Sequence, residues 1–144
     1  LRGIRRRSFA MKALVLPLVL LASPALADDL VFFRSPTGNI ACMIATGDYP
    51  AARCDVMQVT RLSYSVPPAD CDLDWGHAFE VGPVGKGAPA CVGNTVASPD
   101  AMELGYGQSV ELGGFRCQSE KSGMTCVNGQ GHGFTVSKAA QKMF

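Results

Sequence analysis

No segment of this 144-residue chain is long and apolar enough to cross a bilayer. The longest apolar run, residues 13–22, has about ten residues, whereas a membrane-spanning helix needs about 20. The chain also lacks a cysteine directly after its N-terminal apolar segment, which a bacterial lipoprotein requires, because residues 28 and 29 are aspartates. We therefore expect a mature protein that neither spans a membrane nor carries a lipid anchor.

Basic residues are scarce beyond the N-terminal segment. Residues 1–27 hold five of the 13 lysines and arginines and none of the 12 acidic residues. Residues 28–144 therefore have 8 basic and 12 acidic side chains, a net charge of −4. Nucleic-acid affinity depends largely on lysines and arginines that displace counterions from phosphates. A nucleic-acid partner is not expected.

Recognisable catalytic and cofactor motifs are missing as well. The chain has two histidines and no G-x-S-x-G nucleophile motif. It also has no metal-binding motif, no nucleotide-binding loop and no pair of catalytic carboxylates that stands out. We assign no catalytic residue and no cofactor from the sequence.

The N-terminus has the order of a secretory signal peptide, in which a basic residue precedes an apolar run and a small-x-small cleavage site. Lys12 precedes residues 13–22, and Ala25-Leu26-Ala27 supplies the cleavage site. We expect cleavage after Ala27. Residues 1–27 are then an N-terminal extension plus signal peptide, and residues 28–144 form a single secreted, disulfide-bonded domain in the periplasm or outside the cell.

The residues before this signal leave two alternatives open. Met11 is a natural start for it, in which case residues 1–10 are spurious upstream translation. Alternatively, Arg6 and Arg7 belong to a twin-arginine export signal. We favour the ordinary secretory route because basic segments before an apolar run are common in signal peptides.

Six cysteines lie in the predicted mature part: Cys42, Cys54, Cys71, Cys91, Cys117 and Cys126. An even number of cysteines in an exported chain indicates a disulfide framework. Their successive spacings of 12, 17, 20, 26 and 9 residues lack the close C-x-x-C pairs of common zinc sites. We therefore expect structural disulfides and no metal at these cysteines.

Short β-favouring runs separated by Gly, Pro, Asn and Asp predict an all-β fold, a small antiparallel domain built as a meander of hairpins, sandwich-like or barrel-like. One hairpin joins residues 30–34 to residues 39–45. Near the other end, residues 109–112 and 115–119 meet across Gly113-Gly114, a loop favoured by hairpin twist. The tail, residues 137–144, is expected to form one or two helical turns with Ser137 as N-cap.

The turn at residues 120–123 predicts which cysteines pair. It places Ser119 opposite Met124 and hence Cys117 opposite Cys126, and opposed strand residues are close enough for a disulfide after a small adjustment. Cys42 and Cys54 flank a loop in the same manner, which leaves Cys71 to pair with Cys91. The sequential pairing is therefore favoured among the 15 that six cysteines allow.

Five segments resemble a family of secreted bacterial proteins of unknown function. The resemblance covers most of the predicted mature chain and implies secretion and disulfides, but no activity, substrate or catalytic residue. The segments are Phe33-Arg34-Ser35-Pro36-Thr37-Gly38-Asn39-Ile40-Ala41-Cys42, Arg53-Cys54-Asp55-Val56, Asp74-Trp75-Gly76, Leu104-Gly105-Tyr106-Gly107 and Gly131-His132-Gly133-Phe134-Thr135-Val136-Ser137.

Four residues are candidates for a functional role. His132 lies between two glycines, where missing side chains let another backbone or a ligand approach closely. We favour a structural, glycine-rich loop over a catalytic histidine. Trp75, Tyr106 and Phe134 lie beside glycines and could form a recognition surface. Aromatic side chains in a small β domain are more often part of the core.

Asp70, Asp72 and Asp74 alternate as in the first half of a calcium-binding loop. The pattern then fails, because the sixth position is Trp75 instead of glycine and the twelfth is Val81 instead of glutamate. A solvated acidic turn is the favoured interpretation, and the three aspartates are a weak candidate metal site.

The sequence favours a noncatalytic binding module outside the cytoplasm. Its loops would bind the ligand, an unidentified protein or envelope component. The alternatives are a small secreted hydrolase that uses His132 and a structural envelope protein.

Overall fold

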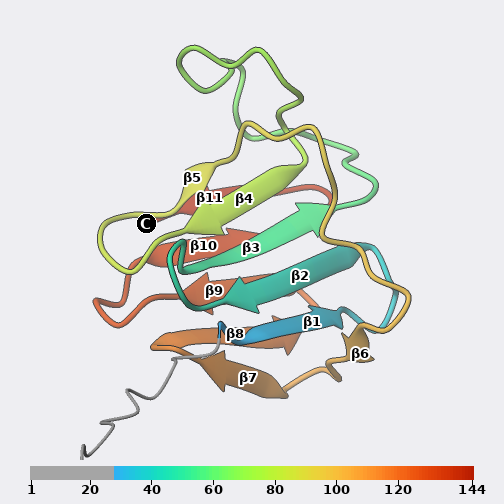
Figure 1. The fold of residues 1–144 in the computed structure, drawn as a ribbon. Helices are drawn as coiled ribbons and strands as arrows, with labels where there is room; N and C mark the ends of the chain where they lie inside the picture. The colour runs from blue at the N-terminus through green and yellow to red at the C-terminus, as the bar shows by residue number, and fades with distance from the viewer. Residues whose placement is uncertain (1–27) are drawn as a thin grey trace, which may run out of the picture.

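The computed structural model describes residues 28–144 (Figure 1). The predicted signal peptide and its cleavage site lie outside the described residues on their N-terminal side, so the structure says nothing of them. Residues 28–144 contain eleven β-strands and no helix, and the predicted all-β class is confirmed. No helix in this part of the chain is therefore long and apolar enough to cross a membrane.

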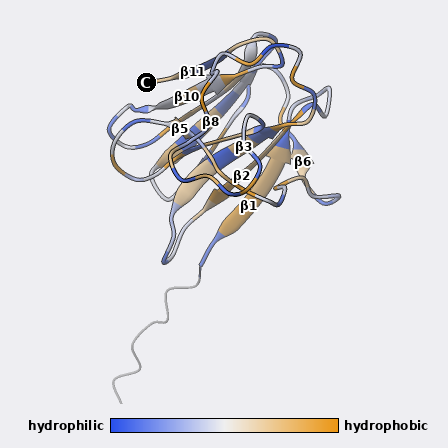
Figure 2. Cartoon of the chain, turned by 90° about the horizontal axis from the view of Figure 1, so that it is seen from above, coloured by the Kyte–Doolittle hydropathy of each residue, from blue (hydrophilic) through white to orange (hydrophobic). Residues whose placement is uncertain are grey.

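The strands form two sheets that pack face to face as a β-sandwich (Figures 1 and 2). The first sheet is antiparallel except for β6, which pairs parallel to β1. In spatial order its strands are β5 (Ala88–Pro89), β4 (Ala78–Val81), β3 (Ala51–Val56), β2 (Ile40–Ala45), β1 (Leu30–Arg34) and β6 (Met102–Glu103).

The second sheet is an antiparallel meander throughout. In spatial order its strands are β11 (Gln141–Met143), β10 (Gly133–Val136), β9 (Gly123–Val127), β8 (Phe115–Glu120) and β7 (Ser109–Leu112).

The predicted hairpins have the turn chemistry that their sequences indicate. Between β1 and β2, the amide of Gly38 donates to the carbonyl of Ser35, and Gly38 takes a φ of 74°. Between β7 and β8, Gly113 and Gly114 have φ values of 59° and 87°, which suit the two-residue turn of a twisted hairpin. Both connections therefore need glycine for its positive φ.

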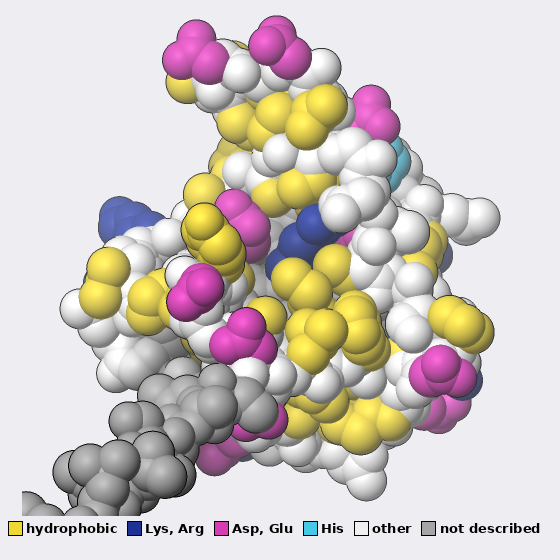
Figure 3. Space-filling view, viewed as in Figure 1, with side chains coloured by type: hydrophobic (Ala, Val, Ile, Leu, Met, Phe, Trp, Pro, Cys, Tyr) yellow, Lys and Arg dark blue, Asp and Glu magenta, His cyan; other side chains and the backbone are white. Residues whose placement is uncertain are grey.

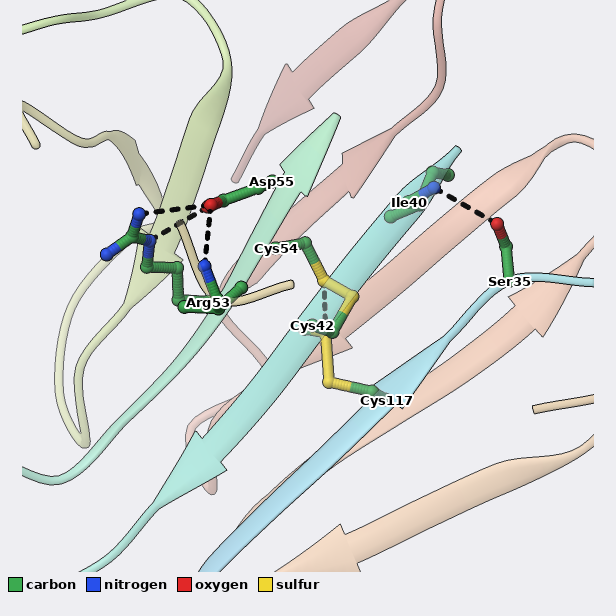
Figure 4. The surroundings of a disulfide bond; sticks show 9 residues. Ser35, Ile40, Cys42, Arg53, Cys54, Asp55 and Cys117 are labelled. Atoms are coloured by element: carbon green, nitrogen blue, oxygen red, sulfur yellow. Dashed lines mark hydrogen bonds and ion pairs between the residues drawn. A yellow bond between two sulfur atoms is a disulfide. The ribbon is translucent and has the colours of Figure 1, made fainter. Parts of the chain in front are cut away.

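Two disulfides stack against each other at the centre of the sandwich. Cys42 on β2 is bonded to Cys54 on β3, and Cys117 on β8 is bonded to Cys126 on β9. All four side chains are fully buried, and the sulfurs of Cys54 and Cys126 lie 3.7 Å apart, across the two sheets (Figure 4). The pairing is the one that the hairpin register predicts.

Large apolar side chains fill the remaining space between the sheets. Alternate residues along each strand point inward, as in the exposure of β8, where every second side chain is buried. β1 and β2 are hydrophobic along most of their length (Figure 2). The largest fully buried side chains are Phe33, Ile44, Phe79, Phe115, Met124 and Phe134.

The predicted C-terminal helix is not present, and this expectation is corrected. Ser137 does cap a turn, since its hydroxyl accepts from the amide of Ala140 at 3.2 Å, but the chain then continues as β11. Eight residues are too few for a stable isolated helix. The free edge of β10 instead provides backbone hydrogen-bond partners for a further antiparallel strand. Gln141 fixes this arrangement, because its buried amide binds the carbonyls of Arg61 and Ser137 and the amide of Ser63.

Antiparallel strands place the connections at two opposite ends of the sandwich (Figure 1). We call the open end the one formed by residues 35–39, 57–77, 90–97, 105–107, 121–122 and 137–140. We call the closed end the one formed by residues 46–50, 82–87, 113–114, 128–132 and Phe144. The two ends differ in construction and contain different candidate residues.

Candidate functional site

The larger hollow of the open end has a volume of about 730 Å³ and lies where turns from both sheets meet. We name it the Tyr106 hollow. Tyr106 stands on its rim with 43% of its surface exposed. The lining residues are Ser35, Thr37, Gly38, Asn39, Ile40, Met57, Gln58, Tyr106, Glu120, Lys121, Ser122, Gly123, Ser137, Lys138 and Ala139.

Side-chain hydrogen bonds hold the first-sheet wall of the Tyr106 hollow. The amide group of Asn39 donates to the carbonyl of Gln58 at 3.2 Å and accepts from the amide of Gln58 at 2.9 Å. The hydroxyl of Ser35, which is buried, accepts from the amide of Ile40 at 3.1 Å. The turn after β1 is thereby fixed to the segment after β3.

The second hollow, of about 490 Å³, lies between two loops of the first sheet. We name it the Trp75 hollow, since the only tryptophan of the chain lines it. Its floor is the end of β3 and the start of β4. The lining residues are Asp55, Val56, Met57, Asp74, Trp75, His77, Ala78, Val92, Gly93, Asn94, Thr95 and Ala97.

A buried ion pair anchors one wall of the Trp75 hollow to the sheet. Arg53 and Asp55 on β3 point away from the disulfide core, and their charged groups meet at 2.9 and 3.1 Å (Figure 4). Arg53 also donates to the side chain and the carbonyl of Asn94 at 3.0 and 2.8 Å. Asp55 accepts from the amide of Val96 at 3.0 Å. The loop at residues 94–96 is therefore clamped onto β3.

The two walls of the Trp75 hollow are also bonded to each other. Cys71, before β4, is bonded to Cys91, after β5. Next to this bond, the amide of Val92, one residue after Cys91, donates to the carbonyl of Asp74, three residues after Cys71, at 3.0 Å. These are the two loops on either side of the hollow, so the third disulfide fixes their separation.

Met57 lines both hollows and is 40% exposed. The two hollows are therefore neighbours on one surface, with an apolar side chain between them. Met57 was not predicted to be functional from the sequence, because the first residue of a loop has no periodic pattern to mark it.

His132 lies at the closed end and lines neither hollow. Its amide donates to the side chain of Asn128 and its carbonyl accepts from the amide of Asn128. The side-chain amide of Asn128 in turn donates to the carbonyls of Gly82 and Gly85 at 3.0 and 2.9 Å. The backbone of His132 therefore takes part in a network that joins two turns.

Backbone, and not a ligand, occupies the space that Gly133 leaves free. A Cβ at Gly133 would overlap the carbonyl oxygen of Cys126, and a Cβ at Gly87 would overlap the carbonyl oxygen of Gly133. The amides of both glycines donate to the carbonyl of Phe144, at 2.8 and 3.3 Å. The close approach expected beside His132 is thus made at Gly133 by two other segments of the chain, whereas a Cβ at Gly131 would meet no atom within 4 Å.

The remaining candidates are placed in two different environments. Phe134 is fully buried in the core, so it is not available to a ligand. Asp70, Asp72 and Asp74 are exposed on the loop that precedes β4. Within residues 28–144, no group of three or more His, Cys, Asp or Glu side chains is arranged to hold a metal ion.

Sequence reasoning missed the Arg53–Asp55 pair as a functional element. One signal was present: two charged residues alternate with apolar ones in a strand, Ala51–Val56, where the outward face would be expected to meet water. Both are instead almost fully buried, Arg53 at 6% and Asp55 at 4% exposure. Only the position of the loop at residues 92–97 reveals what covers them.

Fold and site together define a small, disulfide-braced β-sandwich whose loops form two adjoining hollows at one end. A family model covers residues 13–144, and the chain belongs to that family, a family of unknown function (DUF6636). No curated protein and no solved structure matches the chain.

The segments that carry the sequence resemblance contribute to both hollows. Ser35, residues 37–40, Tyr106 and Ser137 line the Tyr106 hollow. Asp55 and residues 74–75 line the Trp75 hollow. Segments that are far apart in the sequence therefore converge on the open end of the sandwich.

Proposed function

We propose that this chain is an exported, noncatalytic binding module that recognises a protein or another envelope component with the open end of its sandwich. One observation carries the proposal: Tyr106 and Trp75 line two hollows that share Met57. Aromatic side chains and methionine are enriched in the central parts of binding interfaces. Exposed Val66 and Leu73, on the loop before β4, add apolar surface at the same end.

The construction of the open end also supports a binding role. Binding residues are commonly carried on loops that a rigid scaffold positions. Here the scaffold is a sandwich with two disulfides in its core, and the loops are fixed by the Arg53–Asp55 pair and the Cys71–Cys91 bond. A surface that is fixed before binding loses less entropy when a ligand is bound.

Export fits the cysteine chemistry. Three disulfides and no free cysteine within residues 28–144 suit an oxidising compartment, because cytosolic thiols are kept reduced. Intact-mass analysis of the exported protein tests the processing: we expect an N-terminus at Asp28. A soluble cytoplasmic product that retains residues 1–27 would contradict export.

Site-specific photocrosslinking tests the binding role. A benzophenone amino acid replaces Tyr106 in one variant and Tyr49 in the other. Tyr49 is a matched control, since it is 90% exposed and lies in the β2–β3 turn at the closed end. In cells that export the protein, we expect one discrete adduct from position 106 and none from position 49.

Competition separates a specific partner from chance collisions. Excess unlabelled wild type should abolish the adduct from position 106, whereas excess Met57→Glu should not, because a charge between the hollows weakens binding. Equal crosslinking from both positions, or no adduct from position 106, would contradict the proposed function.

A further inference from the structure

The Trp75 hollow is lined by two aspartates, Asp55 and Asp74, by His77, and by no lysine or arginine. Asp70 and Asp72 lie earlier on the loop that carries Asp74. On the face drawn in Figure 3, the tip of the projecting loop carries acidic side chains with no lysine or arginine next to them. Asp74 lines the hollow, is exposed, and forms no ion pair within residues 28–144.

Apart from His77, which lines the hollow, the basic side chain close to it is Arg53, and Arg53 is already paired. Arg53 uses its guanidinium on Asp55 and on Asn94, at distances between 2.8 and 3.1 Å, and it does not line the hollow. Charge-assisted pairs of this kind are roughly twice as strong as neutral hydrogen bonds. The buried pair therefore serves to hold the wall, and of the two carboxylates that line the hollow Asp74 is the one without an ion pair within residues 28–144.

Trp75 supplies the second element of a cation site. The face of an indole ring attracts ammonium and guanidinium groups, and tryptophan is the best of the aromatic side chains for this purpose. An aromatic wall beside a carboxylate attracts an organic cation by two independent effects. The same carboxylate would repel an anionic ligand.

The Trp75 hollow is also joined to a second hollow. Met57 connects it to the Tyr106 hollow, whose rim carries Lys121 and Lys138 together with Glu120. A ligand that extends from one hollow to the other must therefore be positive at the Trp75 end and is not required to be positive at the Tyr106 end. A polypeptide segment with a basic side chain meets this condition, whereas a small ammonium ion fills only one hollow.

We propose that the Trp75 hollow binds the arginine or lysine side chain of a partner polypeptide, through the ring of Trp75 and the carboxylate of Asp74. This assignment rests on the proposed binding function and names the chemistry of its ligand. The two walls are fixed in advance by the Cys71–Cys91 disulfide and by the Arg53–Asp55 pair.

The single tryptophan makes the hollow directly observable by fluorescence. The mature protein is titrated with a short acetylated and amidated peptide, Gly-Arg-Gly, and with the same peptide in which citrulline, a neutral analogue of similar shape, replaces arginine. Lysine and glutamate peptides and tetramethylammonium complete the series. We expect a saturable change in Trp75 emission with the arginine and lysine peptides and at least about tenfold weaker binding of the citrulline and glutamate peptides.

Two variants with the same change in net charge locate the effect. Asp74→Asn should weaken the arginine peptide about threefold, as expected for one partly exposed charge pair. Asp48→Asn, in the β2–β3 turn at the closed end, should leave its affinity unchanged. Equal effects of the two variants would show general charge attraction and would overturn the proposal.

The remaining outcomes are also decisive. Equal binding of the arginine and citrulline peptides, or no saturable change with any cationic peptide, would overturn the assignment of a cation site. Tetramethylammonium binding as tightly as the peptides would overturn the assignment of a polypeptide side chain. If position 106 still crosslinks to a partner in these cases, the binding function stands and only the assigned ligand chemistry is wrong. If the crosslinking experiment also fails, both the binding function and the cation site are overturned.

Discussion

The two ends of this sandwich are built by opposite means from the same hairpin architecture. At the closed end, short turns pack backbone against backbone, as Gly87, Gly133 and Phe144 do. At the open end, long loops are held by side chains and by a disulfide, and two hollows remain between them. Closely packed backbone leaves no room for a ligand, whereas loops that side chains hold apart leave space between them.

The difference follows from loop length. The connection between β3 and β4 covers residues 57–77, while that between β4 and β5 covers residues 82–87. A loop of six residues can close over the end of the sheet, but a loop of 21 must project (Figure 1). Its base is fixed to the second sheet, because the amide of Thr60 donates to the carbonyl of Lys138 at 2.8 Å.

Gly133→Ala should have the largest effect on stability of the changes considered. The new Cβ would overlap the carbonyl oxygen of Cys126, and two bonded strands cannot separate to admit it. We expect a loss of at least about 3 kcal/mol in the free energy of unfolding, the upper end for overpacking, measured by urea denaturation.

Gly38→Ala is the control at the open end. Gly38 also has a positive φ, but a Cβ there meets no atom within 4 Å. The cost should be about 1 kcal/mol, from the left-handed conformation alone. Similar losses at both positions would contradict the difference in packing between the two ends.

The Arg53–Asp55 pair should show the next largest effect. Asp55→Ala leaves a buried guanidinium unpaired, and removing one partner of such a pair costs about 3 kcal/mol or more. The double variant Arg53→Met, Asp55→Ala should lose clearly less than the sum of the two single variants. A double-mutant cycle on the free energy of unfolding measures this coupling, and strict additivity would show that the pair does not act as a unit.

Loss of the Cys71–Cys91 disulfide should cost about 2 kcal/mol, the low end for a disulfide, because hydrogen bonds to Asn94 and Val96 still hold one wall. The paired change Cys71→Ser, Cys91→Ser should leave the sandwich folded. We expect its near-ultraviolet circular dichroism to change while its far-ultraviolet spectrum stays that of a β protein. Global unfolding would show that the open end is part of the scaffold.

Mild reduction of the native protein also compares the Cys71–Cys91 disulfide of the open end with the two disulfides of the core. Cys71 and Cys91 are half-buried, whereas the four core cysteines are fully buried. Alkylation and mass spectrometry should therefore detect Cys71 and Cys91 first, at least about ten times faster than the others, which need wider opening of the fold. Earlier labelling of Cys117 would contradict this order.

His132→Ala should have the smallest effect, about 1 kcal/mol, the centre of the range for single substitutions. The hydrogen bonds that His132 makes are those of its backbone, which the variant keeps. Crosslinking at position 106 should not change. A broad hydrolase screen is run in parallel, and robust turnover by wild type that the folded variant lacks would overturn the noncatalytic proposal.

Local rules were enough to predict the hairpins. The Gly113-Gly114 turn and the register that pairs Cys117 with Cys126 follow from turn residues and alternation, which act over a few neighbouring positions. The tail from Ser137 was predicted incorrectly for a related reason. Its local signal, a capping serine, fits a helix and a turn equally well, and the free edge of β10 decided between them.

The sequence by itself determined the all-β class, the hairpin turns and the two hairpin disulfides, because each depends on residues that are close along the chain; the Cys71–Cys91 pairing followed by elimination. The tertiary structure decided which aromatic side chains remain accessible. Phe134 went to the core and Tyr106 to the rim of a hollow, although both lie beside glycines. The hollows themselves depend on how two sheets and several long loops meet, and that arrangement includes contacts between segments far apart in the sequence, such as Arg53 with Asn94, 41 residues apart.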